Sequence, residues 1–207
     1  AFGVEPPEIP EPVPMGTSII KQTFSPNPSD VTVIEEVRQT ADPNNPIIDT
    51  NDLNLYLHAK QQRQLMQIKQ ALREQLDEGI LQVETREDRV VITIDEQASF
   101  PSGLATIKPA FMPVLKAIAE ALSHIDDPLV VSGHTDNRPL STQQYRSNWE
   151  LSGSRATSVV HELLRYPEYQ ADRFRVEGYA DTRPITENDT DSGRARNRRV
   201  EIAVLTQ

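Results

Sequence analysis

The order of strand-like and helix-like segments in the second half of the chain constrains its fold more than any other feature. Residues 89–95 (RVVITID) are rich in β-branched side chains and predict a buried strand. The periodicity of the apolar residues predicts further strands over 129–133, 174–178 and 199–205, and helices over 111–123 and 148–165. This order is typical of a two-layer α/β (α+β) sandwich with a βαβαβ-type core, in which helices cover one face of a small sheet.

The first 50 residues differ in composition from the rest of the chain. They hold nine of its 16 prolines, and eight acidic residues against two basic ones. The run from residue 5 to residue 14 contains five prolines and favours the extended polyproline-II conformation. We therefore expect residues 1–50 to form an acidic, extended linker that has no core of its own.

A helix is expected between this linker and the sheet domain. The polar cluster at residues 49–52 is typical of a helix N-terminus, and Gly79 of a helix end. One face of this helix carries the apolar residues Leu65, Ile68, Leu72 and Leu76. This stripe predicts packing on the domain or on a dimer mate, and a releasable latch is an alternative. The predicted division is thus a linker (1–50), a linker helix (51–79) and a domain (80–207).

Composition argues against several classes of function. The formal net charge is −10, which disfavours nucleic acid as the main partner because phosphate binding requires a basic surface. There is no cysteine, so thiol nucleophiles, disulfides and thiolate metal sites are excluded. No apolar run approaches the roughly 18 residues of a membrane helix, and the sequence as given predicts a soluble chain.

One motif occurs twice. Residues 133–139 (GHTDNRP) and 178–184 (GYADTRP) share Gly, Asp, Arg and Pro at equivalent positions, and each copy follows a predicted strand. Two such loops are expected to leave the same end of the sheet. Gly, Asp and Pro are also common turn residues, so the repeat fits turn chemistry as well as a functional site.

Arg155 is unusual within the predicted helix 148–165. It lies four residues from both Leu151 and Val159, so its stem runs along the buried face. A desolvated guanidinium requires an anionic partner. That partner is Asp136, another acid of the protein, or a ligand.

Four ordered motifs together resemble the signature of the OmpA-like peptidoglycan-binding domain. They are GHTD, NWELSGSRA, RFRVEGYADTRPI and GRARNRRVEI, all between residues 89 and 205. GHTDNRPL and GYADTRPI are also similar to the flagellar stator B subunits of the MotB and PomB type. The resemblance implies the periplasmic part of a homodimeric inner-membrane protein of a Gram-negative bacterium. Its membrane segment, outside this sequence, would join a stator A subunit.

The resemblance also implies a ligand, which is the free end of meso-diaminopimelate in the peptidoglycan stem peptide. This end carries an ammonium and a carboxylate on one carbon. By the family pattern Asp136 takes the ammonium, Arg155 takes the carboxylate and Asn148 helps to hold the ligand. Thr135 and Leu151 complete the expected binding set, with Asn197, Arg198, Arg199 and His134 in support. The three residues of the Arg-rich end are interpreted as an internal ion-pair region, with direct ligand contact as the alternative, and His134 as a packed, hydrogen-bonded residue.

An enzyme is the rival class. His134 and Asp136 alternate along a strand and could share one face as an acid–base or metal site, and Asp136 with Asp181 could form a carboxylate pair for glycan cleavage. No HExxH or GxSxG motif accompanies them. We therefore expect a non-catalytic wall anchor of a flagellar stator, without metal or cofactor. A generic OmpA/Pal-like tether with no motor role is the alternative.

Overall fold

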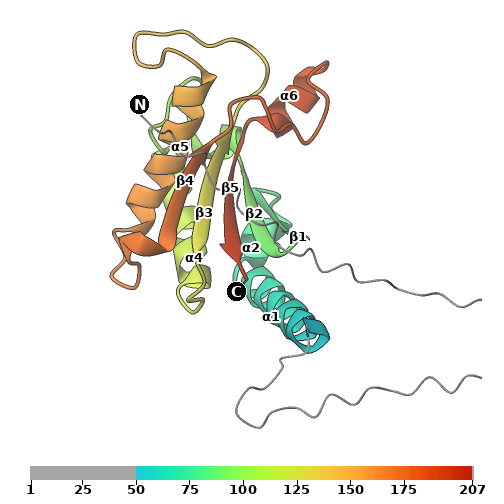
Figure 1. Cartoon of the computed structure of the whole chain (residues 1–207). Helices are drawn as coiled ribbons and strands as arrows, with labels where there is room; N and C mark the ends of the chain where they lie inside the picture. The colour runs from blue at the N-terminus through green and yellow to red at the C-terminus, as the bar shows by residue number, and fades with distance from the viewer. Residues whose placement is uncertain (1–49, 207) are drawn as a thin grey trace, which may run out of the picture. The chain divides into compact units, whose positions relative to one another are not determined.

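The computed structural model describes residues 50–206, and the proline-rich linker predicted for residues 1–50 lies almost entirely outside this range. Within it, five strands form one sheet in the order β1-β2-β5-β3-β4 (Figure 1). The strands are β1 (Leu81–Arg86), β2 (Arg89–Asp95), β3 (Leu129–His134), β4 (Phe174–Gly178) and β5 (Arg199–Leu205). Only β3 and β4 pair in parallel. The predicted two-layer sandwich is confirmed.

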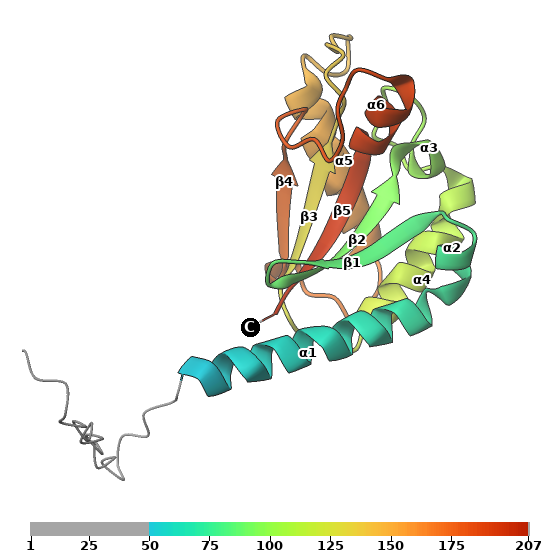
Figure 2. The same ribbon diagram turned by 90° about the vertical axis from the view of Figure 1, so that its right-hand side faces the viewer.

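The helices that build the second layer all pack on one face of the sheet. They are α1 (Thr50–Ala71), α2 (Arg73–Asp77), α4 (Met112–Leu122) and α5 (Asn148–Leu163). The main core combines their apolar residues with alternate strand residues such as Ile92, Val131 and Ile202. The intervening strand residues, Val91 among them, face the other side of the sheet. Figure 2 shows this open side, with α4 and α5 behind the strands.

Sequence patterns missed the short or irregular elements. These are β1, α3 (Glu96–Ser99), α6 (Asp191–Asn197) and two 3-10 turns, η1 (Pro109–Phe111) and η2 (Ala171–Arg173). The edge strand β1 buries only two of its six side chains, so its apolar signal is weak. It pairs with β2 through a two-residue turn in which Glu87 has φ of 53°. An Asn-Gly or Asp-Gly pair is the usual signal for such a turn, and this chain has neither there.

The helix predicted over 51–79 divides into α1 and α2 at Leu72 and ends before Gly79, whose φ of 69° is the expected left-handed conformation. Its C-terminal part is attached to the domain by Ile68 and Leu72, which are fully buried. Lys60 and Gln64 add polar contacts to Asp127 at 2.7 and 2.6 Å. Whether this helix also acts as a latch or in dimerisation stays a prediction.

The two glycines that open the repeat allow α5 to lie directly on the sheet. A Cβ at Gly133 would lie 2.0 Å from the backbone oxygen of Ser152, and a Cβ at Gly178 would lie 2.8 Å from the backbone nitrogen of Gly153. The Ser152 hydroxyl also accepts a hydrogen bond from the Ala180 amide at 3.1 Å. This close approach sets the position of the N-terminal half of α5 above the ends of β3 and β4.

We predict that Gly133→Ala lowers the free energy of unfolding by about 3 kcal/mol, because the added methyl group collides with backbone that cannot move freely. Gly153→Ala is the matched control, since a Cβ at that helical position meets no atom within 4 Å. It should raise stability by up to about 1 kcal/mol through helix propensity. Denaturant unfolding of both variants checks this, and equal effects would contradict the packing argument.

Candidate functional site

A cavity of about 560 Å³ lies where the C-terminal end of β3 meets the N-terminus of α5 and the segment after β2. The five residues expected to bind ligand all line it, although they come from two separate stretches of sequence. They are Thr135, Asp136, Asn148, Leu151 and Arg155. Arg198, expected in a supporting role, lines the same cavity.

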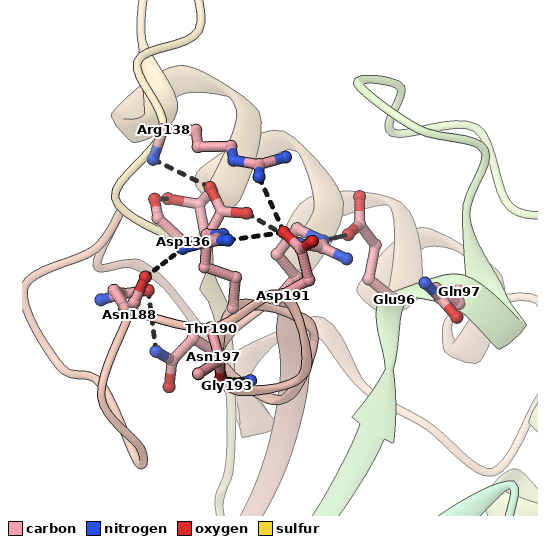
Figure 3. A network of polar contacts seen from close by, with 12 residues as sticks. Glu96, Gln97, Asp136, Arg138, Asn188, Thr190, Asp191, Gly193 and Asn197 are labelled. Carbon is pink, nitrogen blue, oxygen red and sulfur yellow. Dashed lines mark hydrogen bonds and ion pairs between the residues drawn. The ribbon is translucent and has the colours of Figure 1, made fainter.

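Four charged side chains of the cavity form a chain of alternating sign. Figure 3 shows its two acidic members, Glu96 and Asp136. Arg155 donates from Nη2 to one carboxylate oxygen of Glu96. The other Glu96 oxygen accepts from Nε of Arg198 at 2.5 Å, and Nη1 of Arg198 donates to Asp136 at 2.7 Å. Two cations and two anions thus alternate, and these four charges sum to zero.

The Arg155 guanidinium is the most deeply buried charge of this chain, with 1% of the residue exposed. Its Nε donates to the carbonyl of Leu104 at 2.9 Å, and its Cζ lies 5.4 Å from the centre of the Phe100 ring. Burial lowers the pKa of Arg155, and the attraction of Glu96 opposes that effect. The anion that the sequence required for Arg155 is therefore another acid of the protein, Glu96.

Asp136 is held in place by the loop that follows it. Its second carboxylate oxygen accepts from the backbone amide of Arg138 at 3.0 Å. The Asn148 side chain donates to the carbonyls of Asp136 and Arg138, at 3.3 and 2.9 Å. Asn148 thus ties the start of α5 to the loop, and the carboxylate of Asp136 is positioned before any ligand arrives.

Comparison with known proteins identifies the family of this domain. The sequence model of the OmpA family matches residues 99–198. A solved structure described as the cell wall anchor of the T6SS from Pseudomonas aeruginosa is 40% identical, with a TM-score of 0.64; the match covers 68% of this chain and 97% of that one. The chain belongs to the OmpA family.

Other relatives of this OmpA-family chain include proteins of motility. Motility protein B of Bacillus subtilis (strain 168) is 35% identical over 141 residues, which is 67% of this chain and 54% of that protein. The periplasmic domain of Helicobacter pylori MotB (residues 78–256) is 26% identical with a TM-score of 0.55, covering 61% of this chain and 82% of that one. The probable lipoprotein YiaD of Escherichia coli (strain K12) is 36% identical over 118 residues, 56% of this chain and 52% of YiaD. The chain spans about half the length of the two full-length relatives.

The Arg-rich end of the OmpA-family domain divides between the two faces of the sheet. Arg198 points into the cavity. Burial lowers its pKa, but one hydrogen bond each to Asp136 and Glu96 and the attraction of both carboxylates outweigh burial and raise the pKa. Arg199 lies on the open face and pairs with Glu201 at 2.6 Å. The side-chain oxygen of Asn197 accepts from two backbone amides, at residues 185 and 186. Arg198 therefore combines the two sequence interpretations, since it forms internal ion pairs and also lines the cavity.

His134 lies on the opposite side of the sheet from Asp136, in a second cavity of about 560 Å³. Its ring stacks on Tyr179 with the centroids 5.3 Å apart. The expectation of a hydrogen-bonded histidine is wrong, because neither ring nitrogen has a hydrogen-bond partner among the described residues. His134 and Asp136, which could have formed an acid–base or metal site, thus line different cavities. Asp181, the proposed second carboxylate of a glycosidase pair, is exposed and lines neither of them.

Within residues 50–206, no cluster of three or more His, Asp and Glu side chains is arranged to hold a metal ion. None of the helices in that range combines the length and hydropathy of a membrane span.

Sequence reasoning missed Glu96, the central anion of the chain. It is the first residue after β2, and its amide donates to the carbonyl of Arg198 at 3.1 Å. The antiparallel register of β2 and β5 pairs Asp95 with Arg199. Glu96, the residue after Asp95, therefore lies beside Arg198. A single acid at the end of a strand has no distinctive spacing, so only the strand pairing could have identified it.

We predict that His134 makes the domain sensitive to mild acid. Burial, together with the nearby Arg199, lowers the pKa of His134 from 6.5 to about 4. The unfolded chain therefore takes up a proton between these values while the folded chain does not, so stability falls as the pH falls. Between pH 7 and pH 5, the free energy of unfolding of the wild type should therefore fall by about 2 kcal/mol through His134. The His134→Gln variant should not show this loss. Denaturant unfolding at both pH values measures this, and equal losses in the two proteins would contradict it.

Proposed function

We propose that this domain anchors its protein to the cell wall by binding the free end of diaminopimelate in the peptidoglycan stem peptide, without catalysis. The observation that supports this most directly is the alternating charge chain, which presents a fixed carboxylate and two guanidinium groups to one cavity. An ammonium and a carboxylate on one carbon require that combination. In this proposal Asp136 binds the ammonium, and the arginine side of the cavity binds the carboxylate.

The other predicted residues have distinct parts in this proposal. Asn148 holds the loop that carries Asp136, while Thr135 and Leu151 form the walls that face the ligand. Since these groups are ordered by contacts inside the protein, the ligand does not have to order them on binding. Affinity and geometry, rather than a chemical step, would then carry the function.

We further propose that the anchored protein is a flagellar stator subunit. Similarity to Motility protein B supports this role. The proposal includes a periplasmic location, a homodimer, and a stator A subunit bound through a membrane segment outside this sequence. It also keeps the division into linker (1–50), linker helix (51–79) and domain (80–207). Similarity to the probable lipoprotein YiaD supports the second candidate, a wall tether with no motor role.

The site is tested by Asp136→Asn, which preserves shape and removes the charge. We expect at least about 30-fold weaker co-sedimentation with diaminopimelate-type peptidoglycan, because truncating a buried charge pair costs about 2–5 kcal/mol. Asp181→Asn is the matched control, since it makes the same change in the second copy of the repeat, outside the cavity.

The control variant should sediment as the wild type does, and both variants should retain the wild-type circular dichroism spectrum. A folded Asp136→Asn protein that binds within about threefold of wild type would overturn the site assignment. The same supernatants should contain no soluble muropeptides after prolonged incubation. Their release by the wild type would favour an enzyme instead.

The motor role is tested in the native organism with a tagged full-length protein. We expect a polytopic stator A subunit to co-purify with it from detergent-solubilised membranes, and deletion of the gene to abolish swimming. A deletion strain that swims normally, with no such subunit recovered, would favour the generic tether. This result leaves the site assignment untouched, because wall binding is measured separately.

A further inference from the structure

We infer that Glu96 determines the charge specificity of the site: it keeps the buried part of the cavity electrically neutral, so that a zwitterionic end is accepted and a plain carboxylate is rejected. This inference rests on the proposed function and adds to it a specificity-determining residue that the family motifs did not identify.

The first observation is that Glu96 already occupies the guanidinium groups that a ligand carboxylate needs. Glu96 is 5% exposed, and its two carboxylate oxygens accept hydrogen bonds from Arg155 and Arg198. An incoming carboxylate must therefore share both cations with an anion that is already present. Because Glu96 and Arg155 are almost fully buried, the repulsion between two such carboxylates is larger there than it is in water.

The second observation is the charge count of the buried chain. Arg155 and Arg198 balance Glu96 and Asp136, so a plain carboxylate would bring three anions against two cations. A zwitterion brings its own ammonium and leaves the balance at zero. Discrimination of this kind penalises the wrong ligand and does not require any additional contact with the right one.

Two further cations line the cavity but lie toward solvent. The side chain of Arg138 is 65% exposed and pairs with Asp191 at 2.8 Å (Figure 3). The Lys108 ammonium donates to the backbone carbonyl of Gln97 in an exposed contact. Water and salt screen both of these charges, so the buried chain dominates the electrostatics around the bound group.

Glu96 is also held firmly enough to act in this way. It opens the short helix α3, where the Asp95 carboxylate accepts from the amide of Gln97 at 2.7 Å. Its own amide is bound to the carbonyl of Arg198. With the backbone fixed on both sides, Glu96→Gln should change the charge and leave the shape of the cavity in place.

The experiment compares two tripeptides, L-Ala-γ-D-Glu-meso-diaminopimelate and the same peptide ending in 2-aminopimelate, which keeps the terminal carboxylate and lacks the amine. We expect the wild type to prefer the first by about 30-fold or more. In Glu96→Gln the second peptide should bind about tenfold more tightly, so that the preference shrinks to a few-fold. Isothermal titration calorimetry at fixed ionic strength measures all four affinities.

Glu150→Gln is the matched control. It makes the same change of charge near the N-terminus of α5, but Glu150 pairs with the exposed Arg146 and does not line the cavity. Its peptide preference should equal that of the wild type. If Glu96→Gln also keeps the wild-type preference, or loses affinity for both peptides equally, Glu96 is only structural and the inference is wrong.

Two outcomes remain to be separated. If the wild type binds neither peptide, the proposed function fails, whatever the variants do. If Glu96→Gln does not fold, Arg198→Gln tests the same argument by removing a positive charge instead of a negative one. Removing one cation makes the buried chain negative, so the preference for the diaminopimelate peptide must rise, and an unchanged preference would overturn the inference.

Discussion

The burial of the Arg155 guanidinium is the constraint on which the rest of the site depends. A charge that is 1% exposed is costly unless an anion and hydrogen-bond acceptors surround it. Glu96 and the Leu104 carbonyl supply these, and both belong to the segment that follows β2. The ion pair therefore joins α5 to the segment that follows β2. Arg198 then extends the pair to Asp136, so the carboxylate of Asp136 in the cavity is aligned by the same buried charge.

The repeated motif shows how one local structure can serve two purposes. In both copies the glycine lets α5 approach a strand end, and the two loops are joined by hydrogen bonds from Thr135 to Ala180 and from Tyr179 to Gly133. After that point the copies diverge, because Asp136 faces the charged cavity while Asp181 is exposed. The shared glycines thus reflect a backbone requirement, and only the first copy carries a buried carboxylate into the site.

Sequence patterns were sufficient for the elements whose side chains alternate strongly between core and solvent. The strands 89–95, 174–178 and 199–205 were predicted with the bounds that the structure has, and the two main helices to within a few residues. Helical spacing alone placed Arg155 on a buried face.

The patterns failed where position depends on a partner distant in sequence. The edge strand β1 becomes a strand by pairing with β2, and Glu96 meets Arg198 across 102 residues of chain. The lack of a hydrogen bond at either ring nitrogen of His134 could not be predicted either, because it depends on the groups that the fold places around the ring. Local periodicity contains no information about such contacts, whereas the strand register does.

The positions of α1 and of the site at opposite ends of β3 have a mechanical consequence for an anchor. Asp127, which accepts hydrogen bonds from Lys60 and Gln64 of α1, lies two residues before β3, and Asp136 lies two residues after it. About 20 Å of strand separate the two points, at roughly 3.3 Å per residue. Through Asp127, part of a load that enters at α1 and leaves through a bound stem peptide would run along β3, which is hydrogen-bonded on both sides by β4 and β5. Many backbone hydrogen bonds then share that load, whereas α1 is held by the buried side chains of Ile68 and Leu72 and by its polar contacts to Asp127. If the domain acts as the proposed anchor, we expect it to release α1 or its ligand before the sheet unfolds.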